Sequence, residues 1–186
     1  MAPSFKVPGP IDFRRFDIRI ARIHHIFPME KFIDGCTNNM HNMHYYKGPE
    51  DDLDMDIKLV INDVAKHYPE DALIDKMVVM LCNCFVTEID QFKNRGKFLC
   101  AVSGDKVELL LPPPGGSEGD EVIVDGFPRD PDEPFMMPHE HAFELVSPDF
   151  KVDSSGQAVY KDIPLKVEGK GIIKAETLYD CPIKFL

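Results

Sequence analysis

The sequence predicts a mostly β protein organised around a small barrel of strands. Residues 16–26 alternate apolar and charged side chains, which is the period of a half-buried strand. Residues 57–64 and 76–86 are short apolar runs rich in β-branched side chains. Turns rich in glycine and proline separate such runs, and helical patterns are few. Five or so strands with few helices are typical of a small barrel.

The middle of the chain supplies further elements. Residues 76–86 are apolar enough for a central strand that is buried on both faces. Before this strand, residues 69–76 begin with proline and acidic side chains, which predicts one short helix. Gly104 and Asp105 separate "KFLCAV" from "KVELLL", so we expect a hairpin there.

A compositional boundary near residue 127 divides the chain. Residues 126–143 contain four prolines and several acidic side chains that break regular structure, and strand patterning returns afterwards. We therefore expect a linker over residues 1–12, a barrel domain over 13–127 and a smaller unit over 128–186. A further strand is expected over residues 121–124. The acidic segment 47–56 is expected to be a solvated loop, because its like charges repel one another.

The composition limits the partners and the location. The formal net charge is −11, which argues against tight non-specific binding to a polyanion. No apolar run approaches the roughly 20 residues that cross a bilayer, and the N-terminus lacks the apolar core of a signal peptide. We expect a cytoplasmic protein with no membrane partner. The five cysteines lie mostly in apolar runs, which favours buried, reduced thiols.

Four motifs, taken in order, resemble the endothelial-monocyte-activating polypeptide II (EMAP II) family. They are "FDIRIARI", "MVVMLCN", "KVELLLPPPGGSEGDEV" and "YKDIPLKVEGKGIIKAETL". The family comprises tRNA-binding domains of multisynthetase complexes and of some methionyl- and tyrosyl-tRNA synthetases. The resemblance runs from about residue 13 to residue 186. It implies a five-stranded OB-fold barrel followed by a smaller β-rich C-terminal unit that mimics a dimer interface.

One family motif is absent. The RNA-facing edge of relatives usually carries an Arg-Gly pair after the buried strand, followed by a serine. In this sequence Asp90 and Gln91 stand at the Arg-Gly positions and Asn94 stands at the serine position. The segment before Lys58 is also longer and more acidic than in relatives. These departures predict a weak or altered grip on tRNA.

A short basic and aromatic segment is the first candidate nucleic-acid site. Phe92, Lys93, Arg95 and Lys97 supply an aromatic ring for stacking on bases and cations for phosphates, which is how such barrels bind single strands. The alternative is that residues 93–97 form a solvated turn and that Phe98 points into the barrel.

Arginines near the N-terminus form a second candidate group. Arg19 and Arg22, together with Arg14 and Arg15, would form a basic stripe on a strand that could meet phosphate. The alternative is a solvated outer face of that strand.

The sequence offers little for metal binding or catalysis. His41 and His44, like His139 and His141, are spaced as pairs, but no further ligand completes either set. No phosphate loop, nucleophile elbow or metalloprotease motif is present. We therefore expect no metal, no cofactor and no enzymatic activity.

Two functions remain open. The first, implied by the resemblance, is a non-catalytic tRNA-binding accessory domain of an aminoacyl-tRNA synthetase or a multisynthetase complex, which raises the local tRNA concentration by tethering. The second is a protein-interaction scaffold that kept the fold but lost most RNA binding. It would contact synthetases or complex scaffold proteins through the C-terminal unit or through residues 40–46, "MHNMHYY".

Overall fold

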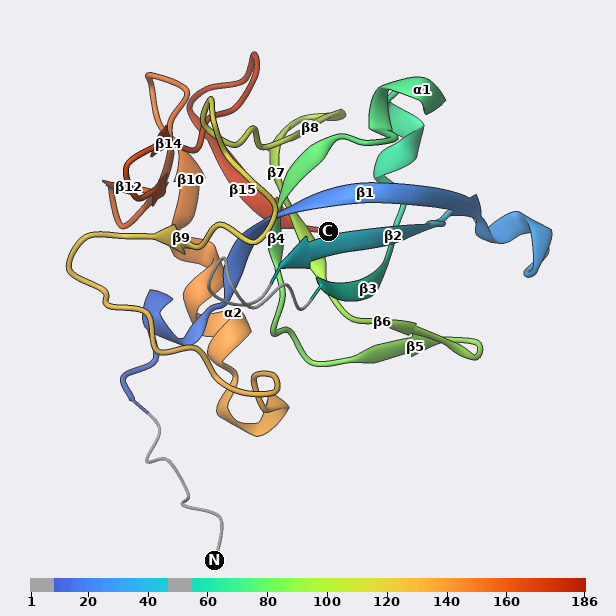
Figure 1. The fold of residues 1–186 in the computed structure, drawn as a ribbon, viewed down its shortest axis with the longest axis horizontal. Coiled ribbons are helices and arrows are strands. Elements are labelled where there is room, and N and C mark those ends of the chain that lie inside the picture. Colours follow the sequence, from blue (N-terminus) through green and yellow to red (C-terminus); the bar gives the residue numbers. More distant parts are fainter. Residues whose placement is uncertain (1–8, 47–54) are drawn as a thin grey trace, which may run out of the picture.

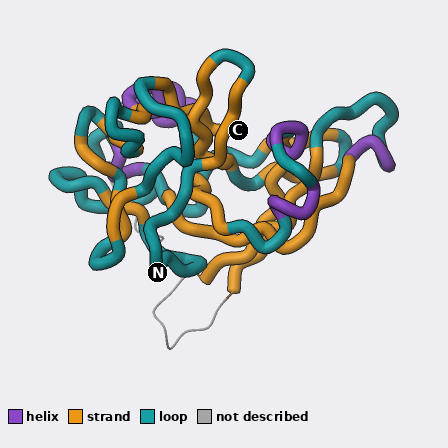
Figure 2. Tube along the Cα trace, turned by 90° about the horizontal axis from the view of Figure 1, so that it is seen from above, coloured by secondary structure: helices purple, strands orange, loops and turns teal. Residues whose placement is uncertain are grey.

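The structure, a computed structural model, describes residues 9–46 and 55–186. Most of the expected linker and of the acidic segment 47–56 therefore lies outside the described residues. Strands and loops make up most of the chain, and the helical segments are short (Figure 2). The prediction of a mostly β fold is confirmed.

Five antiparallel strands form the barrel (Figure 1). They are β1 (Ile18–Pro28), β2 (Asn39–Tyr46), β3 (Met55–Asn62), β4 (Met77–Leu81) and β7 (Lys97–Ser103). Their order in the sheet is β3-β2-β1-β4-β7. The barrel closes where the backbone N–H of Arg95 donates to the carbonyl oxygen of Leu59 on β3, at 2.9 Å.

The first half of β1, strand β4 and the middle of β7 are buried on both faces, and their side chains alternate between two cores. On β1, Ala21 and Ile23 face the barrel core, whereas Ile18 and Ile20 face a second core shared with the C-terminal part. Strand β4 is thus the expected central strand, but it ends at Leu81, before the end of the expected range 76–86. The first half of β1 was expected to be half-buried and is fully buried, because the C-terminal part covers its other face.

Short elements connect these strands. The 3-10 segment η2 (Met29–Lys31) follows β1, and η3 (Val64–His67) and α1 (Glu70–Leu73) precede β4 at the place where a short helix was expected. The hairpin β5 (Thr87–Ile89) and β6 (Phe92–Asn94) lies between β4 and β7. Strand β8 (Lys106–Leu109) pairs with β7 and completes the expected hairpin around Gly104.

Strand β2 changes the interpretation of residues 40–46. His41, Met43 and Tyr45 alternate along β2 and are buried in the barrel. The hypothesis that this stretch is an adaptable contact surface is therefore wrong for these three side chains. The sequence did not reveal this strand, because one of its buried positions is a histidine.

The C-terminal part is β-rich with one short helix (Figure 1). Its elements, from the end of the barrel onward, are β9 (Val122–Ile123), η4 (Pro138–Glu140), α2 (Ala142–Val146), η5 (Ser147–Asp149), β10 (Phe150–Val152), β11 (Ala158–Tyr160), β12 (Ile163–Pro164), β13 (Lys166–Val167), β14 (Gly171–Ile172) and β15 (Cys181–Phe185). Helix α2 was not expected, since prolines dominate the segment before it.

Backbone pairing joins the C-terminal part to the barrel. Strand β15 pairs with both β7 and β10, so one sheet of ten strands runs through the molecule. Strand β13 pairs with β9. The N-terminal segment η1 (Phe13–Arg15) also packs on this part, with the rings of Phe13 and Tyr160 centred 5.6 Å apart. Segment η1 and the C-terminal strands therefore both help to fix the position of the barrel strands.

Candidate nucleic-acid interface

A pocket of about 340 Å³ brings together residues that are far apart in the sequence. It contains Lys93 and Arg95 from the candidate basic segment, together with Lys58 from β3, which sequence reasoning had not included. Its complete lining consists of Lys58, Cys82, Cys84, Val86, Lys93, Arg95, Pro134 and Phe135. Three cations and an aromatic ring thus converge on one pocket.

The backbone around Lys93 and Arg95 is anchored to the barrel. Asp90 has a positive φ of 56° and, with Gln91, turns the chain between β5 and β6. The amide of Asn94 then pairs with the backbone of Ile61 on β3, accepting from its N–H at 3.0 Å and donating to its carbonyl at 3.4 Å. Lys93 and Arg95 stand on either side of this anchor.

The positive charge of the cations at the pocket remains available to bind a phosphate. Lys93 and Arg95 are exposed, and neither forms an ion pair with another described residue. Glu88 faces Lys93 across the hairpin ladder without an ion pair between them. The ammonium of Lys58 donates to the carbonyl oxygen of Cys82 at 2.6 Å, which fixes its position and leaves two N–H donors.

The thiols at the inner side of the pocket are neutral. Cys82 and Cys84 are buried, and burial raises the pKa of the Cys82 thiol to about 12. Phe135 is half-buried, and its ring meets the ring of Phe85 edge to face at 5.4 Å. The pocket therefore has an exposed cationic rim at Lys93 and Arg95 and a mostly apolar interior, which the half-buried Lys58 enters at the carbonyl of Cys82.

Two residues of the basic segment do not line this pocket. Phe92 packs against Phe32, with ring centroids 5.5 Å apart, beside a small apolar cluster on η2, β2 and β3. The ammonium of Lys97 lies 5.4 Å from the ring centre of Phe143 on α2. Phe98 is fully buried in the barrel core.

The arginines of β1 are paired with acidic residues. Arg19 is 8% exposed and donates to the carboxylate of Asp17 at 2.9 Å and to the carbonyl of Gly119 at 3.2 Å. Arg22 is half-buried and forms an ion pair with Glu118. In the sequence these arginines look like a basic stripe. In the structure their acidic partners neutralise their charge.

Arg14 and Arg15 lie on η1 and not on a strand, so they do not extend that stripe. Arg15 is buried and makes two hydrogen bonds to Asp132, at 2.6 and 2.7 Å, and one to Glu140 at 2.6 Å. The hydrogen bond to Asp132 raises the pKa of Arg15. Its carboxylate partners fasten the N-terminal segment to residues 132–140, next to the pocket residues Pro134 and Phe135.

Comparison with known proteins finds similarity to proteins associated with tRNA synthetases. No family model matches it. It is 32% identical over 175 residues to aminoacyl tRNA synthase complex-interacting multifunctional protein 1 of Cricetulus griseus, which covers 94% of this chain and 46% of that protein. It is 28% identical over 183 residues to the cytoplasmic methionine–tRNA ligase of Caenorhabditis elegans, covering 98% of this chain and 19% of the ligase. The chain is thus similar, over nearly its whole length, to EMAP II-like proteins associated with tRNA synthetases.

A solved structure supports the fold of this chain. The C-terminal domain of Plasmodium vivax p43 superposes with a TM-score of 0.77 at 22% identity, covering 94% of this chain and all of that domain. The two proteins share a fold. The chain spans about half the length of the multifunctional protein 1 relatives that it matches.

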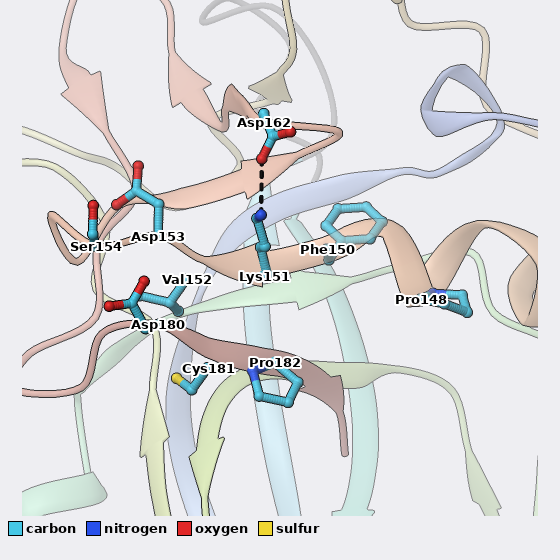
Figure 3. A pocket seen from close by; sticks show the side chains of 10 residues that line it. All are labelled: Pro148, Phe150, Lys151, Val152, Asp153, Ser154, Asp162, Asp180, Cys181 and Pro182. Carbon is cyan, nitrogen blue, oxygen red and sulfur yellow. Dashed lines mark ion pairs between the residues drawn. The ribbon is translucent and has the colours of Figure 1, made fainter.

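A second hollow, of about 630 Å³, lies on the C-terminal part (Figure 3). Asp153, Asp162 and Asp180 line it, and its one lysine, Lys151, is paired with Asp162 at 2.9 Å. Its excess of carboxylates would repel a polyanion. Of these two hollows, only the pocket at Lys93 and Arg95 has the charge that nucleic acid requires.

Histidines of the described residues do not gather into a metal centre. No group of three or more His, Cys, Asp or Glu side chains within residues 9–46 and 55–186 is placed to hold a metal ion. His41 is buried, and His44 stacks on His24 with ring centres 4.3 Å apart. Over the same residues, no helix is long and apolar enough to cross a membrane.

Proposed function

We propose that this chain is a non-catalytic, tRNA-binding accessory domain that serves an aminoacyl-tRNA synthetase or a multisynthetase complex in the cytoplasm. Its relatives include a protein named for interaction with the synthase complex and a cytoplasmic tRNA ligase, which supports that setting. The observation that carries the RNA-binding part is the convergence of Lys58, Lys93 and Arg95 on one pocket. By holding tRNA, the domain would raise its concentration near the synthetase.

The proposed tRNA binding is weak or altered compared with that of a basic RNA-binding domain. The three cations of the pocket attract phosphates, but the whole chain carries a net charge of −11. Arg19 and Arg22 add little, because Asp17 and Glu118 already neutralise them. Phe92 on β6 and Lys97 on β7 do not line the pocket, but we propose that they contact the RNA beside it.

The test is a titration of the protein with bulk tRNA at low and at physiological salt. We expect binding that weakens with salt. The double variant Lys93→Glu/Arg95→Glu should bind about tenfold or more weakly at low salt, and its plot of log affinity against log salt should be flatter by about 1.5 units, because two phosphate contacts are lost.

A matched variant controls for net charge. Lys31→Glu/Lys184→Glu reverses two exposed lysines that do not line the pocket, so the net charge changes by the same amount. It should keep most of the tRNA affinity. Equal losses in the two double variants would mean that only overall charge matters and would contradict the proposed site.

The C-terminal residues 128–186 are proposed to stand in for the second copy that simpler relatives would supply as a dimer. Two observations support this proposal: β15 adds directly to β7 of the barrel, and the faces of β1 and β4 opposite the barrel core are covered by this part. On this proposal, residues 128–186 cover the face of the barrel that a second copy would otherwise cover.

A scaffold that has lost most RNA binding is the second candidate. Exposed apolar side chains favour it: Phe27 on β1 is 45% exposed and Phe32 beside η2 is 60% exposed. These rings would suit contact with another protein. The same titration separates the two functions, since a scaffold of this kind would not bind tRNA even at low salt.

A further inference from the structure

We propose that the pocket beside Lys93 and Arg95 holds one unpaired nucleotide, so that the RNA element recognised by this chain is single-stranded. This inference rests on the proposed function and specifies its ligand. The pocket has a cationic rim at Lys93 and Arg95 and a mostly apolar interior that the ammonium of Lys58 enters.

The chemistry of the lining matches that of a nucleotide. Cys82 and Cys84 are buried and Val86 is half-buried, whereas Lys93 and Arg95 are exposed. A nucleotide has the same division, with a flat base that stacks on apolar surfaces and a phosphate that pairs with cations. No acidic side chain is among the described residues that line the pocket. The base would lie inside and the phosphate at the rim.

An aromatic ring is held at the pocket wall. Phe135 lines the pocket, and Phe85 supports it with an interplanar angle of 84°. An edge-to-face pair leaves at least one face of each ring uncovered by its partner, and a base can stack on such a face. Arg95 can add a planar guanidinium to the same stack or donate to a phosphate.

The pocket favours an unpaired base over a base inside a duplex. A volume of about 340 Å³ is near the lower end for ligand pockets, which suits a ligand the size of one nucleotide. A base inside a duplex is stacked and paired, so it cannot enter without being extruded. Loops, bulges and chain ends present bases that are already free. The pocket therefore favours these parts of an RNA.

The experiment compares two probes on the full chain by fluorescence anisotropy. One probe is a labelled single-stranded oligoribonucleotide of about eight nucleotides, and the other is the same strand annealed to its complement. At equal salt we expect the single strand to bind at least about tenfold more tightly. Equal or tighter binding of the duplex would overturn the inference.

Substitution of Phe135 gives an independent readout. Phe135→Leu keeps an apolar side chain but removes the aromatic face, and it should weaken single-strand binding by about fivefold or more. Tyr179→Leu replaces an aromatic residue that is 65% exposed and does not line the pocket, and it should leave binding unchanged. An unchanged affinity in a folded Phe135→Leu protein would contradict the inference.

The two proposals fail in distinguishable ways. If tRNA binds with the expected salt dependence but the duplex probe competes as well as the single strand, the nucleotide pocket is wrong and the tRNA-binding function stands. If tRNA does not bind at low salt, both proposals are overturned.

Discussion

At the scale of single residues, His41 is unusual because it is a fully buried imidazole inside the barrel. Its Nδ1 lies 3.3 Å from the carbonyl oxygen of Val60, and within the described chain its Nε2 has no hydrogen-bond partner. Burial lowers the pKa of His41 to about 4. The folded state therefore holds this imidazole neutral, whereas the unfolded chain takes up a proton at an ordinary pKa.

The consequence is a predicted loss of stability in acid. Because the folded pKa lies below the unfolded one, the stability present above about pH 6.5 declines as the pH falls toward 4. Between pH 7 and pH 5, urea unfolding of the wild type should lose about 2 kcal/mol more than that of a His41→Leu variant. Replacing the exposed His139 by Gln should not reduce this loss. Parallel pH profiles for wild type and His41→Leu would show that the prediction is wrong.

The N-terminal arginines show what a sequence cannot reveal at this scale. Arg19 and Arg22 have the spacing of a basic stripe, but the groups that neutralise or bind them include residues about 100 positions away. Conversely, Lys58 gave no sign of belonging with Lys93 and Arg95. Only the closure of the barrel between β3 and the β6–β7 connection makes these residues neighbours.

At the scale of elements, Gly96 permits the close approach between β3, β4 and the start of β7. A Cβ at this position would lie 2.9 Å from Cγ2 of Val60 and 3.3 Å from the carbonyl oxygen of Leu81. These distances are shorter than van der Waals contact, and Leu81 contributes backbone that cannot move alone. The neighbouring Arg95 owes its position to the same packing.

We therefore predict that Gly96→Ala destabilises the protein by about 1–3 kcal/mol, through overpacking of the barrel wall. Chemical denaturation would measure the change in the free energy of unfolding. Gly9→Ala is the matched control, because a Cβ there would meet Arg14 at an ordinary distance of 3.7 Å. A Gly96→Ala protein as stable as this control would contradict the account of the β6–β7 connection.

The sequence patterns predicted the strands that have regular alternation or one continuous apolar run. The alternation over β1 and the apolar run over β4 identified both strands, and Gly104 marked the β7–β8 hairpin. Strand β2 was missed because its inward side chains include His41, and α2 was missed because prolines precede it. The second core on β1 was also hidden, since local alternation does not show that Ile18 and Ile20 face a different core from Ala21 and Ile23.

At the scale of the whole molecule, one sheet of ten strands connects the barrel to the C-terminal part. This continuity sets the pocket at a junction, because Lys58 and Arg95 come from the barrel side and Phe135 from the segment that leads into α2. The resemblance to EMAP II-like proteins implied the fold and the class of partner. The position of the pocket followed only from the assembled structure, since the family's Arg-Gly motif is missing.

The most direct test of the central claim is backbone NMR of the labelled protein during titration with tRNA. Our account predicts that the amide signals of Lys58, Lys93, Arg95 and Phe135 shift or broaden first, while those around Arg19 on β1 change little. Perturbations concentrated at β1 or at the acidic hollow near Asp153, with the pocket signals unchanged, would contradict it.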